Sequence, residues 1–543
     1  LRTHLSHDGA ITAKAAKEED SVYADYYEYS EPITKMRPHR ILALNRGEKV
    51  GFLKVDLCAD EAVAVGKLMS ACAKKDGSAT SEFMKAAATD SYGRLIFPAL
   101  EREIRGELFD EAAEGALKVF SENLKNLLLI APVKGKTVLG FDPGYAHGCK
   151  LAVVDKTGKY LTSTVIYPTK PREDTARAAQ TLLKLIKTYK VDIIAIGNGT
   201  ASRESERFVA DLIKENGLSV AYTIVSESGA SVYSATELAK EEFPELDVNE
   251  RSAVSIARRL QDPLAELVKV DPKAIGVGQY QHDMNPKRME ETLGGVVEDC
   301  VNSVGVDLNT ASASLLAYVS GINKTIAKNI VAYREENGEF TSRAKLLKVP
   351  KLGAKAYEQC AGFLRVVGGD EILDNTGVHP ESYPVAKALL SKFGYTEEDV
   401  RSGGLSMMRF KAEQKGVKKL AEELGCGEPT LLDIIGELEK PGRDVRDDAP
   451  APVLRTDVLE MKDLVPDMVL KGTGRNVVDF GCFVDIGVHE DGLLHVSEMS
   501  DRRFVKHPRE LFSVGDVIEV RIKAVDMQRK RISLSRKGLS ESK

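Results

Sequence analysis

The chain has 543 residues, 29% of them charged and 43% hydrophobic, and a formal net charge of −6; this length predicts several domains, because single cores rarely exceed about 250–300 residues. Its seven cysteines include no C-x-x-C pair, which argues against a structural zinc site and against a disulfide framework. No apolar run approaches the roughly 18 residues of a membrane span and no secretory signal is visible, so we expect a cytoplasmic protein without membrane contact.

Residues 1–130 are predicted to be mainly helical. The segments 59–73 and 107–129 carry apolar residues three and four positions apart, which is the spacing of helices that pack on one another. The chain begins at Leu1 rather than at a methionine. We therefore expect a fragment whose natural N-terminus is missing.

Residues 131–262 change to a pattern of strands and helices. A first apolar strand ends at Asp142, two more strand patterns follow, and a helix leads into a further apolar strand that ends at Asn198. This order predicts a mixed α/β sheet. The segment resembles the ribonuclease H-like fold of YqgF-type domains, in which an aspartate ends the first strand. Active members of that fold hold two divalent ions with several carboxylates, and these ions activate water for phosphodiester cleavage.

Only Asp142 of such a carboxylate set is recognisable. Resolvase-like enzymes of this fold carry a second acid where this chain has Asn198, and a final acid near Ser252, where no carboxylate stands. Because one acid cannot organise two metal ions, we interpret Asp142 as part of a degenerate site, with no catalytic residue and no metal. The alternative is a metal-dependent nuclease with Asp142 as a ligand. Three acids could substitute for the missing ones, namely Glu204, Glu206 and Asp262.

Residues 263–305 are predicted to be a helical connector. Residues 306–368 are predicted to contain two units in tandem, each made of two helices joined by a tight turn. They resemble the helix-hairpin-helix pair of many nucleic-acid-binding proteins. A short turn of this type exposes backbone N–H groups at the start of the next helix, which can hold a phosphate without reading a base. Alternatively, the pair serves only for packing. The candidate phosphate- or DNA-binding residues are Gly321, Asn323, Lys324, Lys351, Gly353 and Lys355.

Three further segments complete the chain. Residues 369–439 are predicted to form a helical domain. Residues 440–455 are charged and rich in proline, which predicts a linker that lets the following domain move somewhat independently. Residues 456–537 alternate apolar and polar positions between glycine corners, which predicts a five-stranded barrel of the OB type.

Two phenylalanines in this barrel suggest an aromatic surface. Phe480 and Phe483 are three residues apart, so a regular strand would place them on opposite faces. Gly481 between them would permit a bulge or a sharp coil that turns both to one face. Exposed rings stack unpaired bases at about 1–3 kcal/mol each. Residues 502–543 contain twelve Lys or Arg against five Asp or Glu, which would attract phosphates. Alternatively, both rings are barrel core and His495 is a packing residue.

The segment from Leu464 to Leu534 resembles the RNA-binding domain that is repeated in ribosomal protein S1. In that family two aromatic residues, a histidine, and an aspartate and arginine beside the last turn line the nucleic-acid face. The resemblance, with the neighbouring lysine included, gives the candidate RNA-binding residues Phe480, Phe483, His495, Asp526, Lys530 and Arg531.

Longer strings extend the resemblance over the whole chain. GNGTASRE (197–204), SESGASVYS (226–234), GVGQYQHD (276–283) and VEDCVN (297–302) are similar to the Tex family of bacterial transcription accessory proteins. The resemblance implies a multidomain fold, mainly α, with an α/β ribonuclease H-like domain and a C-terminal all-β OB-fold (S1) barrel. The helical N-terminal region of the family is only partly present.

The same resemblance implies a function. We expect a cytoplasmic, non-enzymatic transcription accessory factor without cofactors, which binds single-stranded RNA, and also DNA, as a monomer. RNA polymerase or the ribosome is the candidate protein partner. A third hypothesis is a protein-interaction platform for which nucleic acid is secondary.

Overall fold

The computed structural model describes residues 1–17, 19–72, 79–403, 405–455, 464–478, 480–488, 490–501, 505, 508–513, 516–527, 529 and 531–539. The chain divides into two compact units. The first comprises Leu1–Glu122 and Val277–Thr292, and the second comprises Asn123–Gly276 and Leu293–Lys543. Across the described ranges, no helix combines the length and apolar composition that crossing a membrane requires.

The first unit contains a three-stranded antiparallel sheet that the helical prediction missed. Its strand order is β2-β1-β3. Leu53, Val55 and Leu57 of β3 are buried and alternate with more exposed residues, so the period-two signal is present in the sequence. The strands were overlooked because each is only five or six residues long, between stronger helical patterns. Their bounds are Ala10–Ala15 (β1), Glu28–Pro32 (β2) and Leu53–Cys58 (β3).

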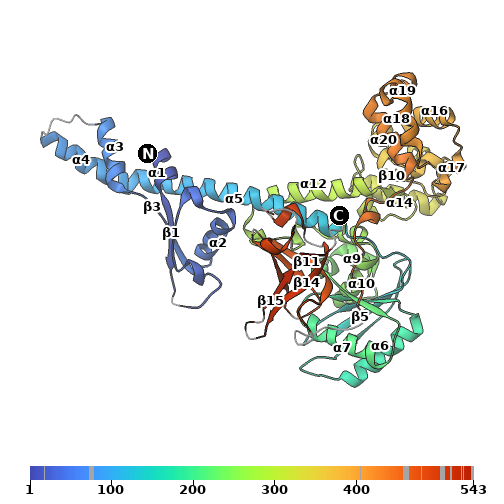
Figure 1. The fold of residues 1–543 in the computed structure, drawn as a ribbon, viewed down its shortest axis with the longest axis horizontal. Coiled ribbons are helices and arrows are strands. Elements are labelled where there is room, and N and C mark those ends of the chain that lie inside the picture. The colour runs from blue at the N-terminus through green and yellow to red at the C-terminus, as the bar shows by residue number, and fades with distance from the viewer. Residues whose placement is uncertain are drawn as a thin grey trace. The chain divides into compact units, whose positions relative to one another are not determined.

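Helices make up the rest of the first unit, and α5 continues beyond it (Figure 1). Leu5 of α1, Leu44 of α2 and Ile104 of α5 pack with the sheet in one core. The helices are α1 (Arg2–Asp8), α2 (Pro38–Lys49), α3 (Glu61–Cys72), α4 (Ala79–Ser91) and α5 (Phe97–Leu128).

The second unit begins with a mixed five-stranded sheet of order β6-β5-β4-β7-β8, which confirms the predicted α/β fold. β4, β5 and β6 are antiparallel neighbours, whereas β7 and β8 continue the sheet in parallel with β4. Helices α6 and α7 pack on one face and α10 on the other (Figure 1). The bounds are β4 (Val138–Asp142), β5 (Cys149–Val154), β6 (Tyr160–Ile166), α6 (Thr175–Tyr189), β7 (Ile193–Gly197), α7 (Ser202–Glu215), β8 (Ala221–Val225), α8 (Ala230–Ser234), α9 (Glu237–Glu242) and α10 (Val248–Gln261).

A helical region follows. Its first part contains the two predicted hairpins, and its second part has a separate core that includes Leu389, Met408 and Ile435. The two-residue strands β9 and β10 pair in parallel and close the hairpin region. The elements are α11 (Pro263–Leu267), α12 (Pro286–Val304), β9 (Val306–Asp307), α13 (Ala313–Leu316), α14 (Lys324–Asn337), α15 (Ala354–Cys360), β10 (Leu364–Arg365), α16 (Tyr383–Phe393), α17 (Glu397–Ser402), α18 (Met408–Lys415), α19 (Val417–Leu424) and α20 (Glu428–Glu439).

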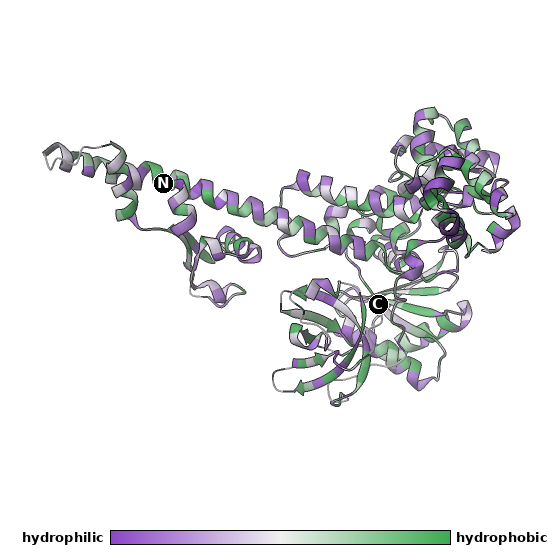
Figure 2. Cartoon of the chain, turned by 45° about the horizontal axis from the view of Figure 1, so that its top comes forward, coloured by the Kyte–Doolittle hydropathy of each residue, from purple (hydrophilic) through white to green (hydrophobic). Residues whose placement is uncertain are grey.

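The last strands form a closed barrel of order β11-β12-β13-β15-β14, as the sequence predicted. Figure 2 shows hydrophobic and hydrophilic residues intermixed along these strands. The hydrophobic set faces inward, because Cys482, Val484, Leu494 and Leu534 belong to one buried core. The strands are β11 (Val469–Val478), β12 (Gly481–Asp485), β13 (Gly492–His495), β14 (Val517–Asp526) and β15 (Arg531–Ser535).

The segment 440–455 is anchored rather than free, contrary to the predicted mobile linker. The side chain of Arg446 is only 4% exposed and lies 2.7 Å from Asp262 and 2.8 Å from Asp444. Farther on, the backbone of Arg455 exchanges two hydrogen bonds of 2.8 Å each with Tyr222 on β8.

The guanidinium of Arg455 also joins two domains. It lies 3.2 Å from Glu206 of α7 and 3.4 Å from Asp485 at the end of β12. Burial alone would raise the pKa of Asp485, but the guanidinium groups of Arg455 and Arg475 outweigh this and hold it below its ordinary value. The prediction failed because local composition does not show which buried carboxylates a linker arginine will meet.

Candidate nucleic-acid interface

Strand register places Phe483 and His495 on the outer surface of the barrel. β12 pairs with β13 so that Phe483 stands opposite Leu493, and Gly481 stands opposite His495. Directly opposite residues of an antiparallel pair point to the same face. The intervening Cys482 fills the core, so Phe483 and His495 face outward.

Phe480 reaches the same surface from the turn that precedes β12. Its side chain is 50% exposed, and its ring meets that of Phe483 edge to face, with 6.2 Å between centroids. Of the two expected devices, the bulge at Gly481 is contradicted, because β12 and β13 pair in unbroken register there. Phe480 lies outside the strand, where alternation of faces does not apply. Its carbonyl accepts the Val496 N–H at 2.9 Å, which ties the turn to the end of β13.

His495 is exposed and has a defined hydrogen-bonding state. Its Nδ1 accepts the backbone N–H of Ser497 at 3.3 Å and lies 2.9 Å from the Ser497 hydroxyl. In the neutral ring the proton is therefore on Nε2. This N–H can donate to a phosphate or to a base edge.

Asp526 and Arg531 stand opposite each other across β14 and β15, and both are exposed. Arg531 is two residues before Ser533, which pairs with Leu493, so Arg531 shares the outer face with Phe483. His495 lies two residues after Leu493, and Arg531 lies two residues before Ser533. Because β13 and β15 are parallel, the two side chains lie on opposite sides of the Leu493–Ser533 pair. OB barrels bind oligonucleotides across this strand face and its flanking loops. Lys530 lies outside the described residues.

The two helical hairpins have turns of the same conformation. Gly321 and Lys351 both adopt left-handed backbone angles, with φ of +79° and +68°. The next residue in each turn, Ile322 or Leu352, donates to the carbonyl three residues earlier, at 3.0 and 3.2 Å. Lys351 therefore occupies the turn position that Gly321 holds in the first hairpin, although a left-handed backbone normally favours glycine.

The two turns differ in what caps the following helix. The side chain of Asn323 accepts the N–H groups of Thr325 and Ile326, each at 3.0 Å, and so competes with a phosphate at the start of α14. Gly353 offers no side chain to cap α15. Lys324, Lys351 and Lys355 are exposed beside these turns.

The ribonuclease H-like site contains an acid that the sequence reasoning missed. Glu227 follows β8. Burial raises the pKa of Asp142 and that of Glu227, and the charge of Asp142 raises the pKa of Glu227 further. Gly199 donates its N–H to the Glu227 carboxylate, and Asn198 accepts the Glu227 N–H at 3.0 Å. A Cβ atom on Gly199 would lie 1.5 Å from Glu227 Oε1, so any side chain there would force the Glu227 carboxylate to move.

The acids proposed as substitutes are engaged elsewhere. Glu204 accepts the Tyr145 hydroxyl at 2.8 Å, Glu206 pairs with Arg455, and Asp262 caps α11 and pairs with Arg446. Among the described residues, no group of three or more His, Cys, Asp or Glu side chains could hold a metal ion. The donor set therefore does not fit the two-metal centre of active ribonuclease H-like enzymes.

The fold and its surfaces define a class of multidomain protein with nucleic-acid-binding modules. The helix-hairpin-helix motif matches residues 301–365, a second HHH domain matches 371–446, and the S1 RNA binding domain matches 464–537. The Tex central region-like family matches 1–120, and the Tex protein YqgF-like domain matches 136–261. The chain belongs to the Tex family.

Full-length relatives agree with this assignment. The chain is 54% identical to the uncharacterized protein YdcI of Bacillus subtilis, over 98% of this chain and 74% of that protein. It is 46% identical to the protein tex of Bordetella pertussis, over 98% and 69%. It is 47% identical to the transcriptional accessory protein Tex of Neisseria gonorrhoeae, over 98% and 70%.

Proposed function

We propose that this protein is a non-catalytic accessory factor of transcription that acts in the cytoplasm as a monomer and binds single-stranded RNA, and also DNA, through its barrel. The observation that carries the proposal is the half-exposed ring of Phe480 in contact with Phe483 on the outer face of the barrel. Two such rings offer stacking surfaces that paired bases inside a duplex cannot use.

Cations and backbone donors complete the binding surface. Arg531 and His495 on the barrel hold phosphates, and the hairpins at 306–368 add contacts through Lys324, Lys351 and Lys355. Several weak contacts on one chain raise the overall affinity by increasing the effective concentration. The name of the Neisseria relative supports a role in transcription. RNA polymerase or the ribosome is the protein partner.

The ribonuclease H-like domain acts as a scaffold in this proposal. The site has two carboxylates, Asp142 and Glu227, whereas an active enzyme of this fold uses several carboxylates to hold two metal ions. The competing hypothesis is a metal-dependent nuclease that uses this pair.

Fluorescence anisotropy of a labelled 12-nucleotide RNA across a salt series tests the binding proposal. The comparison is between the unchanged chain and the combined variant Phe480→Ala, Phe483→Ala, His495→Ala. We expect the variant to lose most of its single-strand affinity and to keep a similar salt slope, because stacking contributes little to counterion release. If the variant binds the RNA as tightly as the unchanged chain, the barrel is not the single-strand binding site.

A further inference from the structure

The helical domain at 371–446 contains a further hairpin-like unit with a concentration of positive charge. Helices α18 and α19 are joined by one residue, Gly416, with φ of +82°. The segment 407–419 contains five Lys or Arg residues and only one acid, Glu413. Because helical positions two apart lie about 200° apart, Glu413 points away from both Lys411 and Lys415.

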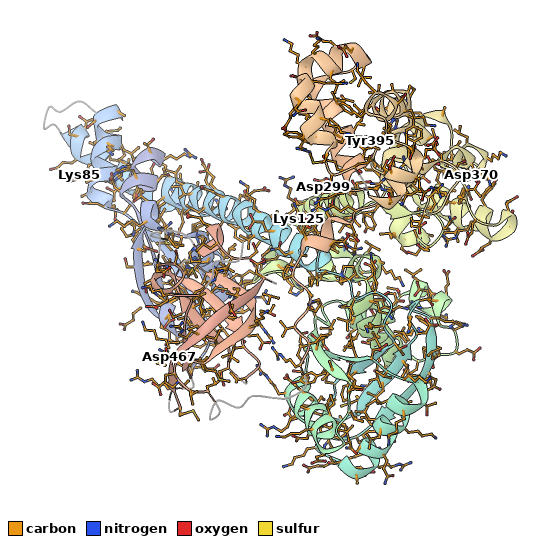
Figure 3. The ribbon with its side chains drawn as sticks, turned by 45° about the vertical axis from the view of Figure 1, so that its right-hand side comes forward. Lys85, Lys125, Asp299, Asp370, Tyr395 and Asp467 are labelled. Carbon is orange, nitrogen blue, oxygen red and sulfur yellow. The ribbon has the colours of Figure 1, made fainter. Side chains whose placement is uncertain are left out.

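Two lysines of α18 lie close to aromatic rings at the end of α16 and just after it. Lys411 Nζ lies 4.1 Å from the ring centroid of Tyr395, which Figure 3 labels. Lys415 Nζ lies 4.9 Å from the ring centroid of Phe393. Contacts between an ammonium group and a ring face are attractive and limit the freedom of the lysine.

The same surface includes one carboxylate, Glu423, which forms an ion pair with Lys392. The hydrogen bond from Lys392 holds the pKa of Glu423 below its ordinary value, and Lys419 and Lys415 add to this effect. Three lysines therefore act on the Glu423 carboxylate, and Lys411 lies one helical turn before Lys415 on α18. We call this surface the lysine face; it comprises Lys392, Lys411, Lys415 and Lys419.

Exposed apolar side chains border the lysine face. Phe410 is 50% exposed and Met407 is 53% exposed. Phe410 lies about 100° around α18 from Lys411, because each helical residue turns by that angle. A base could stack on Phe410 while the adjacent phosphates contact the lysines.

We propose that the lysine face and Phe410 form a second site for single-stranded nucleic acid, separate from the barrel and from the hairpin turns at 306–368. This inference rests on the proposed function, which makes nucleic acid the ligand of the chain. Positive charge next to an exposed ring fits an unpaired strand, whose phosphates and base faces are both accessible. An acidic protein segment is the competing occupant.

The test uses the full chain and a charge-matched pair of variants. The first carries Lys411→Gln, Lys415→Gln and Lys419→Gln. The control carries Lys184→Gln, Lys187→Gln and Lys214→Gln, which removes the same charge from exposed positions on α6 and α7. Circular dichroism and thermal unfolding establish that both variants remain folded.

Binding of labelled 30-nucleotide oligo(U) and oligo(dT) is measured by anisotropy at several salt concentrations. We expect the lysine-face variant to bind about tenfold more weakly than the control, with the salt slope reduced by about 2 for three lost phosphate contacts on a single strand. Phe410→Ala should weaken binding of both strands and leave a duplex of equal length unaffected. Equal binding by variant and control would overturn the proposal, as would an equal loss for the duplex.

The same measurement in the background of the barrel variant separates this inference from the proposed function. Residual binding that disappears only when the lysine face is also changed supports a second site. If the lysine-face substitutions do not change the affinity while the barrel variant loses its affinity, the second site is refuted and the barrel remains the single-strand binding site. If a polyglutamate peptide binds the lysine face and oligonucleotides do not, an acidic segment is the occupant and the inference is overturned.

Discussion

The ring of Phe480 meets the ring of Phe483 edge to face, with 6.2 Å between centroids and 85° between planes. This arrangement is the favourable one for two aromatic rings, because the positive edge of one faces the negative face of the other. The contact fixes an exposed ring that would otherwise rotate freely. In the proposed function, this contact would position Phe480 for stacking before a strand binds and so lower the entropic cost of binding.

Substitution of Phe480 should separate binding from stability. We expect Phe480→Ala to weaken single-strand binding by about 1–3 kcal/mol, equivalent to roughly fivefold to more than 100-fold in Kd. Thermal unfolding should change little, because exposed side chains contribute within about 0.5 kcal/mol. Phe83→Ala removes a ring that is 73% exposed on α4 and serves as the control, with no expected effect on affinity.

Removal of Arg455 should release the segment before the barrel. Arg455→Ala removes the guanidinium that pairs with the buried Glu206, which keeps the hydrogen bond from the Tyr222 hydroxyl at 3.2 Å, and it removes one of two guanidinium groups from Asp485. Breaking a largely buried ion pair costs about 3–5 kcal/mol. Hydrogen exchange should accelerate at the amides of Tyr222 and residue 455. Lys440→Ala, an exposed change in the same segment, should leave both amides protected; equal exchange in the two variants would contradict the anchor.

The left-handed turns predict opposite effects for two substitutions. Lys351→Gly keeps the backbone angle and removes a cation, so the fold should persist while nucleic-acid affinity falls and the salt slope decreases by about 0.7–0.9. Gly321→Ala should destabilise by about 1–2 kcal/mol, because φ is +79° and the added Cβ would lie 2.7 Å from Gln359 Cβ. Chemical denaturation and anisotropy measure the two effects. A loss of stability in Lys351→Gly would argue against this turn conformation.

Replacing Asp142 of the acid pair should stabilise the fold in a pH-dependent way, and the unchanged chain should show no nuclease activity. Burial raises the pKa of Asp142 in the folded state, so between the unfolded and the folded pKa the unfolded state binds fewer protons. Stability therefore falls as pH rises from the unfolded pKa through the folded one. Asp142→Asn should therefore raise the Tm at pH 7 and have a smaller effect near pH 4. RNA and DNA should remain intact with Mg²⁺ or Mn²⁺. Metal-dependent cleavage that disappears in Asp142→Asn would instead support the nuclease hypothesis.

Sequence periodicity predicted the α/β sheet and the barrel because both depend on local alternation of apolar and polar residues. The β3 strand carries the same alternation at Leu53, Val55 and Leu57, but its shortness hid it among helical patterns. Phe480 was assigned to a strand, whereas it lies in the turn before one. Strand boundaries within one or two residues thus decide which face a side chain occupies.

Contacts between distant residues were beyond the reach of local patterns. Glu227 joins Asp142 only because β8 places it next to the ends of β4 and β7, and glycines at 197 and 199 leave space for its carboxylate. Arg455 meets Glu206 from 249 positions away in the sequence. The glycines were visible in the sequence, yet their role depends on an acid from another strand.

The most direct test of the account is to locate a bound single strand on the full chain. A short RNA that carries a photoreactive uridine is crosslinked to the protein, and the adducts are mapped by mass spectrometry. We predict adducts on the outer face of the barrel, at Phe480, Phe483 or His495, which decrease when unlabelled RNA competes. Competable adducts that are confined to other parts of the chain, with none on the barrel, would contradict the claim that the barrel reads single strands.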